Sequence, residues 1–251
     1  MSTPATPART RPLLIAIVAF LALILVGGGI AAATGAFSGG GTPAAPTSDT
    51  TAAAEPATPA SPSASALPDG AASVCGLPGY EETSSLTQAP NVTWSLIGTM
   101  AAPVDMQGAG PGVQEDGGQF RTCFAHTSEG ALFAAINFAA AGSNPSNHPR
   151  MYELLADGKA KDMVRAAGSG TDQTSSDRVQ VAAFKVNAYA SDTATIDLVL
   201  KVTSAGDALV SQPLVLNWEH GDWKVLLTEN GTQYQPSPLS SLGGYIPFAG
   251  V

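Results

Sequence analysis

The sequence predicts an α+β domain in the second half of the chain, because two different hydrophobic periods follow one another there. Between residues 128 and 164 apolar side chains recur every three or four positions, which is typical of helices. Between residues 178 and 228 apolar and polar side chains alternate, which is typical of strands. Helices followed by a run of strands favour an antiparallel sheet with the helices packed on one of its faces.

The chain begins with a segment that is long and apolar enough to cross a membrane. Its first part, LLIAIVAFLALILV, has no polar side chain, and GGGIAAATGAF continues the uncharged stretch beyond the length of about 20 residues that a bilayer requires. Arg9 and Arg11 precede it, and the positive-inside rule keeps them in the cytoplasm. We therefore expect a cytoplasmic tail at 1–12 and a transmembrane helix at 13–37, with the rest of the chain outside. A signal peptide cleaved within AAATGA is the alternative.

Residues 38–71 are built almost wholly from Gly, Ala, Pro, Ser and Thr, and Leu67 is their one large apolar side chain. Such a segment cannot bury enough apolar surface to offset the conformational entropy lost on folding. We therefore expect a disordered linker that holds a folded domain, beginning near residue 72, away from the bilayer.

The composition excludes several classes of partner and chemistry. The formal net charge is −9 and only 12% of the residues are charged, and the basic side chains beyond residue 37 stand singly among carboxylates. Direct nucleic-acid binding, which needs clustered Lys and Arg, is therefore not expected. The chain contains no GxSxG, HExxH or phosphate-cradling glycine loop, so we expect no catalytic residue set, no metal site and no cofactor.

Cys75 and Cys123 are the two cysteines of the chain, and both lie in the part expected outside the cytoplasm. An even pair in an oxidising compartment favours a disulfide. Two free buried thiols are the alternative, because the sequence does not show whether the sulfur atoms meet.

The domain is expected to begin with short strands and to continue with helices. The strand-like runs lie within residues 91–105 and 119–125, and the glycine-rich GAGPGVQEDGG between them is predicted to be a mobile loop. The first helix, at 128–142, is predicted to present one apolar face. Pro149 is placed for the first turn of a second helix, and Asp157-Gly158 precedes a third.

Four strands then form a predicted antiparallel meander. A two-residue turn at His220 and Gly221 would place Trp218 opposite Trp223, where the pair should seal the core. Pro213 cannot donate a hydrogen bond, so it marks a bulge or an edge in the third strand. The four strands are expected at residues 178–189, 194–202, 208–218 and 223–228, and the apolar face near the tryptophans comprises Leu214, Leu216, Val225 and Leu227.

The order of elements, and especially ATIDLVLKV and PLVLNWEHGDWKVLL, resembles the nuclear-transport-factor-like cone fold, in which a curved sheet wraps a helical layer. A membrane anchor, a spacer and such a domain also resemble the envelope scaffold subunit of conjugative type IV secretion systems. RTCFAHTSEGALFAAINFAA is similar to a segment of uncharacterised membrane proteins of actinobacterial integrative conjugative elements. The resemblance covers residues 72–230 and leaves 231–251 as a C-terminal tail.

Five polar residues are the candidates for chemistry. Capping at a helix start accounts for His148, solvent exposure in a turn accounts for His220, and a structural role is expected for His126. In enzymes with a cone fold a polar residue inside the pocket transfers protons, and Asp197 or Tyr189 could take that position. Asp197, however, falls on the polar face of the second strand.

These observations favour an interaction protein over an enzyme. We expect a single-pass protein of the cell membrane whose extracytoplasmic domain acts as a scaffold, with envelope proteins or a second copy as partners. The resemblance implies a component of a conjugative, type IV secretion-like apparatus. The alternative is a binding module that holds an apolar small molecule or a cell-wall component in the cone.

Overall fold

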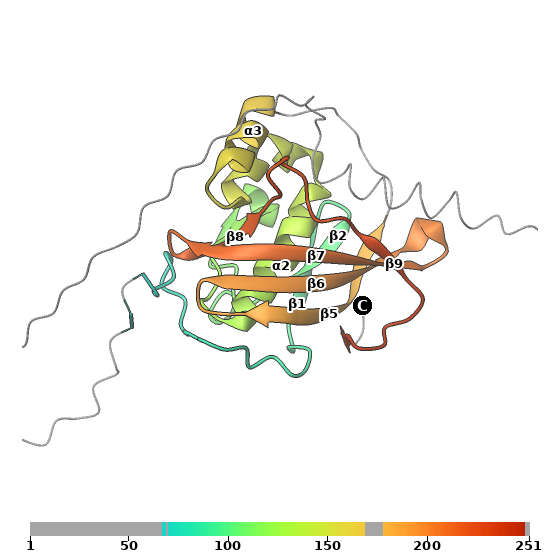
Figure 1. Ribbon diagram of the computed structural model, residues 1–251, viewed down its shortest axis with the longest axis horizontal. Helices are drawn as coiled ribbons and strands as arrows, with labels where there is room; N and C mark the ends of the chain where they lie inside the picture. The colour runs from blue at the N-terminus through green and yellow to red at the C-terminus, as the bar shows by residue number, and fades with distance from the viewer. Residues whose placement is uncertain (1–66, 69, 169–177, 249–251) are drawn as a thin grey trace, which may run out of the picture. The chain divides into compact units, whose positions relative to one another are not determined.

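The computed structural model describes residues 67–68, 70–168 and 178–248 (Figure 1). The predicted cytoplasmic tail, the predicted transmembrane helix at 13–37 and most of the predicted linker lie outside these residues. Within the described ranges, no helix has the length and apolar character needed to cross a membrane.

A curved, antiparallel sheet carries the domain and confirms the predicted α+β class. Its central strands follow one another along the chain as the predicted meander, in the order β5, β6, β7 and β8. Two register shifts in β5, after Val181 and after Val186, are the irregularities that bend a strand. The strands are β5 (Val179–Tyr189), β6 (Thr193–Val202), β7 (Ala208–Glu219) and β8 (Asp222–Leu226).

The register of β7 and β8 agrees with the predicted hairpin. Trp218 pairs with Trp223 across the turn at His220 and Gly221. Pro213 lies where the outer neighbour of β7 changes, because one partner strand pairs up to Ser211 and the other begins at Val215. Among the described residues, Pro213 therefore has no partner strand on this side of β7, and the sheet loses no hydrogen bond through its missing N–H.

One face of the sheet packs on the helix α2 (Ser128–Gly142), which Figure 1 shows behind β6 and β7. The Thr127 hydroxyl accepts a hydrogen bond from the Gly130 amide at 3.0 Å and caps the helix. A Cβ atom at Gly130 would lie 2.0 Å from the Ala125 carbonyl oxygen, so only glycine fits this turn. The inward side chains of β6 are buried against the helix: Ala194, Ile196, Leu198, Leu200 and Val202.

The prediction that α2 presents a single apolar face is wrong. Every residue of the helix except Glu129 is buried, which is typical of a helix enclosed on all sides. Two hairpins provide the second cover, since α2 contacts them as well as the sheet. They are β1 (Thr93–Ile97) with β2 (Met100–Val104), and β3 (Val113–Glu115) with β4 (Phe120–Thr122).

The glycine-rich GAGPGVQEDGG segment is not the free loop that its composition predicts. It contributes β3 and the turn η1 (Asp116–Gly118). The Asp105 carboxylate accepts hydrogen bonds from the amides of Gly108 and Ala109, and the Gly112 amide donates to the Cys123 carbonyl at 2.7 Å. Pairing of β3 with β4 therefore orders this segment, although its glycine-rich composition has no pattern that predicts a strand.

The remaining helical segments lie beyond α2. The turn-like η2 (Pro145–Leu154) begins four residues before the predicted start at Pro149, because the Asn144 side chain caps it. The helix α3 (Lys159–Ala167) follows Asp157-Gly158 as predicted. It packs on η2 and has no fully buried residue.

The predicted boundary of the domain at residue 230 is wrong, because the C-terminal segment belongs to the sheet. β9 (Ser237–Leu239) pairs with β7, and β10 (Ile246–Pro247) pairs with β5. Phe248, which follows β10, is buried in the core. Strands of two or three residues leave no periodic pattern in the sequence, so only their pairing shows them. The turn η3 (Thr203–Ala205) joins β6 to β7.

Candidate functional site

The first segment of the domain, residues 70–75, runs across the β7–β8 turn, and we name it the N-terminal strap. The Cys75 and Cys123 Sγ atoms are bonded, with their Cα atoms 6.2 Å apart, so the predicted disulfide is confirmed. The Val74 amide donates to the Gly221 carbonyl at 2.8 Å, and the Ser73 hydroxyl donates to the Phe124 carbonyl at 3.2 Å. The domain therefore begins slightly before residue 72.

His126 lies buried beneath the strap. Its Nδ1 atom lies 2.8 Å from the Ala71 carbonyl oxygen, and its Nε2 atom contacts the Ser191 carbonyl oxygen. Both ring nitrogens therefore face backbone carbonyl oxygens, one in the strap and one in the turn between β5 and β6. The ring also stacks on Trp218 with 3.7 Å between centroids. His126 thus joins the strap to the sheet, which is a structural role.

The two tryptophans of the predicted core are not equivalent. Trp223 is 2% exposed and donates from Nε1 to the Ala125 carbonyl at 3.0 Å. Trp218 is only half-buried and donates from Nε1 to the Gly70 carbonyl at 2.8 Å. Trp223 is therefore a core residue as predicted, whereas Trp218 covers His126 and holds the strap.

Asp222 is a buried carboxylate that the sequence did not indicate. It accepts hydrogen bonds from the backbone amides of Cys123 at 3.0 Å and Phe124 at 2.9 Å. Lys224 provides the neighbouring positive charge at 3.0 Å. The carboxylate thus ties β8 to the end of β4, beside the disulfide. The Cys123 and Phe124 amides lie almost 100 positions away in sequence, so no local pattern could have revealed this link.

Asp197 lies on the face of the sheet opposite α2, where the C-terminal segment covers it. It accepts hydrogen bonds from the Ser211 hydroxyl at 2.7 Å and the Tyr245 hydroxyl at 2.9 Å. Burial and the adjacent Asp197 carboxylate raise the pKa of Tyr245. These two hydroxyl groups compensate the desolvation of a carboxylate that is 8% exposed.

Tyr189, the other candidate for proton transfer, belongs to a different cluster. Its hydroxyl donates to the Glu81 carbonyl at 3.3 Å, and its ring packs near Trp223. Burial and the negative charge of Glu81 raise the pKa of Tyr189. The structure therefore does not bring Tyr189 together with Asp197.

Arg121 of β4 is a buried guanidinium held by neutral groups. It donates to the Gly118 carbonyl at 2.7 Å, to the Asn137 side chain at 3.3 Å and to the Ser95 hydroxyl at 2.5 Å. Burial lowers its pKa. Asn137 also donates to the Pro103 carbonyl at 3.2 Å, so this network fixes both hairpins to α2.

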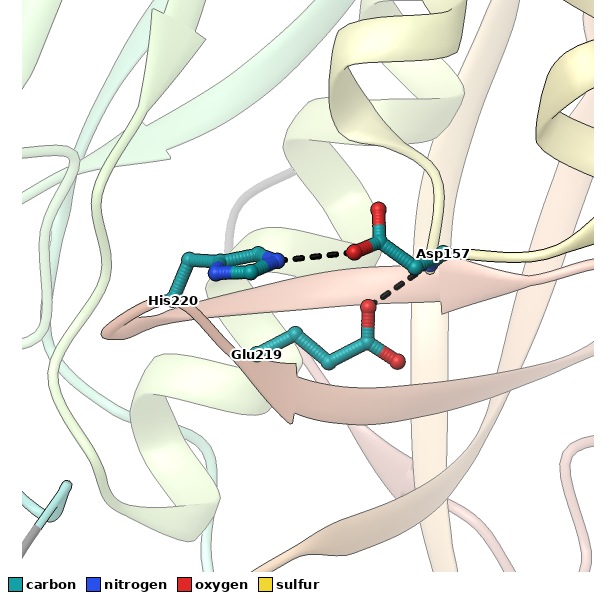
Figure 2. A group of neighbouring side chains, drawn as sticks. All are labelled: Asp157, Glu219 and His220. Carbon is teal, nitrogen blue, oxygen red and sulfur yellow. Dashed lines mark hydrogen bonds and ion pairs between the residues drawn. The ribbon is translucent and has the colours of Figure 1, made fainter.

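A polar group on the surface brings together three side chains that can bind cations: Asp157, Glu219 and His220 (Figure 2). His220 Nε2 lies 2.8 Å from Asp157 Oδ2, and the Asp157 amide donates to Glu219 Oε2 at 2.7 Å. Lys161 contacts the second Asp157 oxygen at 2.8 Å. Hydrogen bonds from Lys161 and His220 lower the pKa of Asp157 to about 2, so the group carries an ionised carboxylate at neutral pH.

The sequence indicated only part of this surface group. His220 was expected to be exposed in a turn, and its side chain is 72% exposed. Asp157 stood out only as a helix-preceding residue, and it lies 62 positions from Glu219. His148 lies elsewhere, with Nε2 3.1 Å from the Gly142 carbonyl at the end of α2, so the three histidines do not converge.

The fold and these sites define a disulfide-bonded α+β domain whose N-terminal strap is fixed to its sheet. The chain belongs to the family described as a domain of unknown function (DUF8175), which matches residues 54–247. The match includes all the described strands and extends into the segment predicted to be a linker. Comparisons with curated proteins and with solved structures found no match.

Proposed function

We propose that this chain is a membrane-tethered protein of the cell envelope, whose domain lies outside the cytoplasm and works by binding protein partners. The observation that carries this proposal is the Cys75–Cys123 disulfide at the start of the domain. Stable disulfides are typical of exported proteins and rare in the cytoplasm. The apolar segment at 13–37 supplies the expected anchor.

The position of the disulfide supports a tether. The strap is the part of the domain that leads back toward residues 13–37, so any pull from the membrane would reach the strap first. The Cys75–Cys123 disulfide holds the strap against such a pull, and the backbone hydrogen bond from the Val74 amide to the Gly221 carbonyl lies next to it. This arrangement suits a domain that must stay folded while it is held at a membrane.

The contacts of the candidate catalytic residues favour binding over proton transfer. Asp197 is held by Ser211 and Tyr245, and Tyr189 is held by the Glu81 backbone. Each of these polar groups has a structural partner within the domain. The space between α2 and the sheet is occupied by apolar side chains, among them Phe133, Ile136 and Leu198.

The finer form of the proposal concerns the fold and the process. We infer a nuclear-transport-factor-like cone and a place in a conjugative, type IV secretion-like apparatus. The order of elements and the resemblance of residues 121–140 support this inference. Genes for a coupling ATPase and other transfer proteins beside the gene for this chain would support the conjugative role, whereas their absence in related genomes would contradict it.

A topology experiment tests the tether. A reporter that is active only outside the cytoplasm, fused after Val251, is expected to be active in the membrane fraction. In intact cells Cys75 and Cys123 are expected to resist alkylation until a reductant is added. Activity of a cytoplasmic reporter at the same position would overturn the proposal, and a soluble product starting within residues 34–37 would replace the anchor with a cleaved signal peptide.

A second experiment separates a scaffold from a small-molecule binder. After cross-linking in cells, the full chain is expected to purify with a reproducible set of membrane proteins or with itself, and a variant lacking residues 1–37 is expected to lose them. A full chain that purifies alone, with a stoichiometric small molecule visible in native mass spectrometry, would favour the binding module instead.

A further inference from the structure

We propose that Asp157, Glu219 and His220 form a surface site for one divalent cation of the zinc class. One ligand atom from each side chain lies within 4.8 Å of the other two. The side chains come from two segments, the end of β7 with its turn and the loop before α3 (Figure 2). This site goes beyond the proposed scaffold function and does not depend on it.

The distances require only small movements to fit an ion. Bonds of about 2.0–2.2 Å in a tetrahedral site place ligand atoms about 3.3–3.6 Å apart. His220 Nε2 and Asp157 Oδ2 are 2.8 Å apart, so this pair would open by less than about 1 Å as the cation replaces the shared hydrogen. Both side chains are more than half exposed, which leaves them free to rotate by this amount.

The outer hydrogen bonds of a metal site are already in place. The Asn217 amide donates to Glu219 Oε1 at 3.2 Å, and the Asp157 backbone amide donates to Glu219 Oε2 at 2.7 Å. Lys161 donates to Asp157 Oδ1 at 2.8 Å, so Oδ2 remains directed at His220. The two amide donors to Glu219 are of the kind that orient a ligating carboxylate and strengthen a metal site.

The backbone holds the two ligand segments side by side. The Ala156 amide donates to the Val225 carbonyl at 2.9 Å, directly before Asp157. His220 itself has a left-handed backbone with a φ of 55°, fixed by the two-residue turn. The ligands are therefore brought together by folding, and binding need not order a loop.

The ligand set selects the class of ion. One imidazole and two carboxylates suit Zn²⁺ and neighbouring transition metals, whereas Mg²⁺ and Ca²⁺ prefer ligands that are all oxygen. The imidazole distinguishes this group from an ordinary surface cluster of acids. The Lys161 ammonium lies 2.8 Å from Asp157 and competes with the cation for this carboxylate. Removing its charge should therefore strengthen zinc binding, whereas removing a ligand should weaken it.

Calorimetric titration of the oxidised full chain in detergent tests the site. Zinc chloride is expected to bind at one ion per chain, with magnesium chloride showing no such binding. His220→Asn is expected to weaken zinc binding at least about tenfold, and asparagine is chosen because it tolerates a left-handed backbone. Asp157→Asn is expected to have the same effect, whereas Lys161→Gln is expected to strengthen binding.

Asp162→Asn is the matched control, because it removes one carboxylate from the first turn of α3 without touching the site. Its zinc affinity is expected to equal that of the wild type, and unchanged melting temperatures without zinc would show that all variants fold. Absence of stoichiometric zinc binding would overturn the proposal. Equal zinc affinity in the wild type and His220→Asn would do the same, by assigning the ion to another site.

Discussion

The N-terminal strap and the C-terminal segment are attached to the same sheet by different means. The strap is held covalently by the Cys75–Cys123 disulfide, and its Gly70 carbonyl accepts a hydrogen bond from the Trp218 indole. The C-terminal segment, residues 237–248, is held by two short strands and by the hydrogen bond that the Tyr245 hydroxyl donates to Asp197. The strongest attachment therefore lies at the end that continues toward the predicted membrane anchor.

This difference shows how the domain distributes its stability. The strap buries few apolar side chains, since Ala71 is small and Val74 is exposed, so it depends on the disulfide and on polar bonds to backbone atoms. The C-terminal segment buries Phe248 in the core and gains sheet bonds as well. Four experiments on variants test this description of how the domain is stabilised.

The largest effect is expected for Trp223→Ala. This side chain packs edge-to-face with His126 and is 2% exposed, so its loss should cost about 3–5 kcal/mol of the free energy of unfolding. Trp218→Ala, at the half-buried partner position, is expected to cost less. Chemical denaturation of both variants measures the difference. A larger loss of unfolding free energy in Trp218→Ala than in Trp223→Ala would contradict this ranking. It would show that the contact of Trp218 with the strap stabilises the domain more than the core packing of Trp223.

Cys75→Ala is expected to have the next largest effect. Cys75 is exposed and separated from Cys123 by 48 positions, so the substitution removes the loop constraint with little loss of packing. Closing such a loop typically contributes about 2–4 kcal/mol. The melting temperature of the oxidised wild type should exceed that of Cys75→Ala, and a reductant should abolish the difference. Equal melting under oxidising conditions would contradict a stabilising strap.

Tyr245→Phe tests the C-terminal attachment. It leaves the buried Asp197 carboxylate with one hydroxyl donor in place of two, which should cost about 1–3 kcal/mol. The exposed Tyr234 provides the control, since Tyr234→Phe is expected to change stability little. Proteolysis near residue 240 should accelerate only in Tyr245→Phe. Equal protection in both variants would mean that the strands alone hold this segment.

The smallest effect concerns pH at Glu81, which follows the strap. Burial raises the pKa of Glu81, but hydrogen bonds from Ser85 and Ser128 lower it by more, so the folded pKa lies below the ordinary value. The ionised carboxylate therefore stabilises the fold above its unfolded pKa, and this contribution is lost as the pH falls through the folded pKa. In Glu81→Gln the acid side of the curve of melting temperature against pH should be flatter. An unchanged curve would exclude Glu81 as a source of acid sensitivity.

Much of the fold follows from the local sequence. Alternation along residues 194–202 determines which side chains face the core, because a strand turns successive residues to opposite sides. Trp218 and Trp223 flank a turn of two residues, and this length alone sets them opposite one another. Thr127 and Ser143 cap the first helix through local hydrogen bonds, at Gly130 and at Ala140 respectively. None of these features depends on a distant part of the chain.

The disulfide could be predicted in part from the sequence and in part only from the tertiary structure. The sequence limited the pairing to one choice, because Cys75 and Cys123 are its two cysteines. Only folding shows that the strap reaches β4 and brings their Cα atoms to 6.2 Å. Composition could identify the partners, but not their approach.

The candidate sites were decided by tertiary structure. Asp222 finds its partners at Cys123 and Phe124, and Asp157 meets Glu219 and His220 across 62 positions of sequence. The strands β9 and β10 exist only because long neighbours offer them a free edge. A single polar side chain or a two-residue strand is too short to show a periodic pattern in the sequence. Its role therefore depends on the groups that lie beside it in the folded chain. The sequence by itself therefore determined the meander and its central helix, whereas folding determined which polar groups meet.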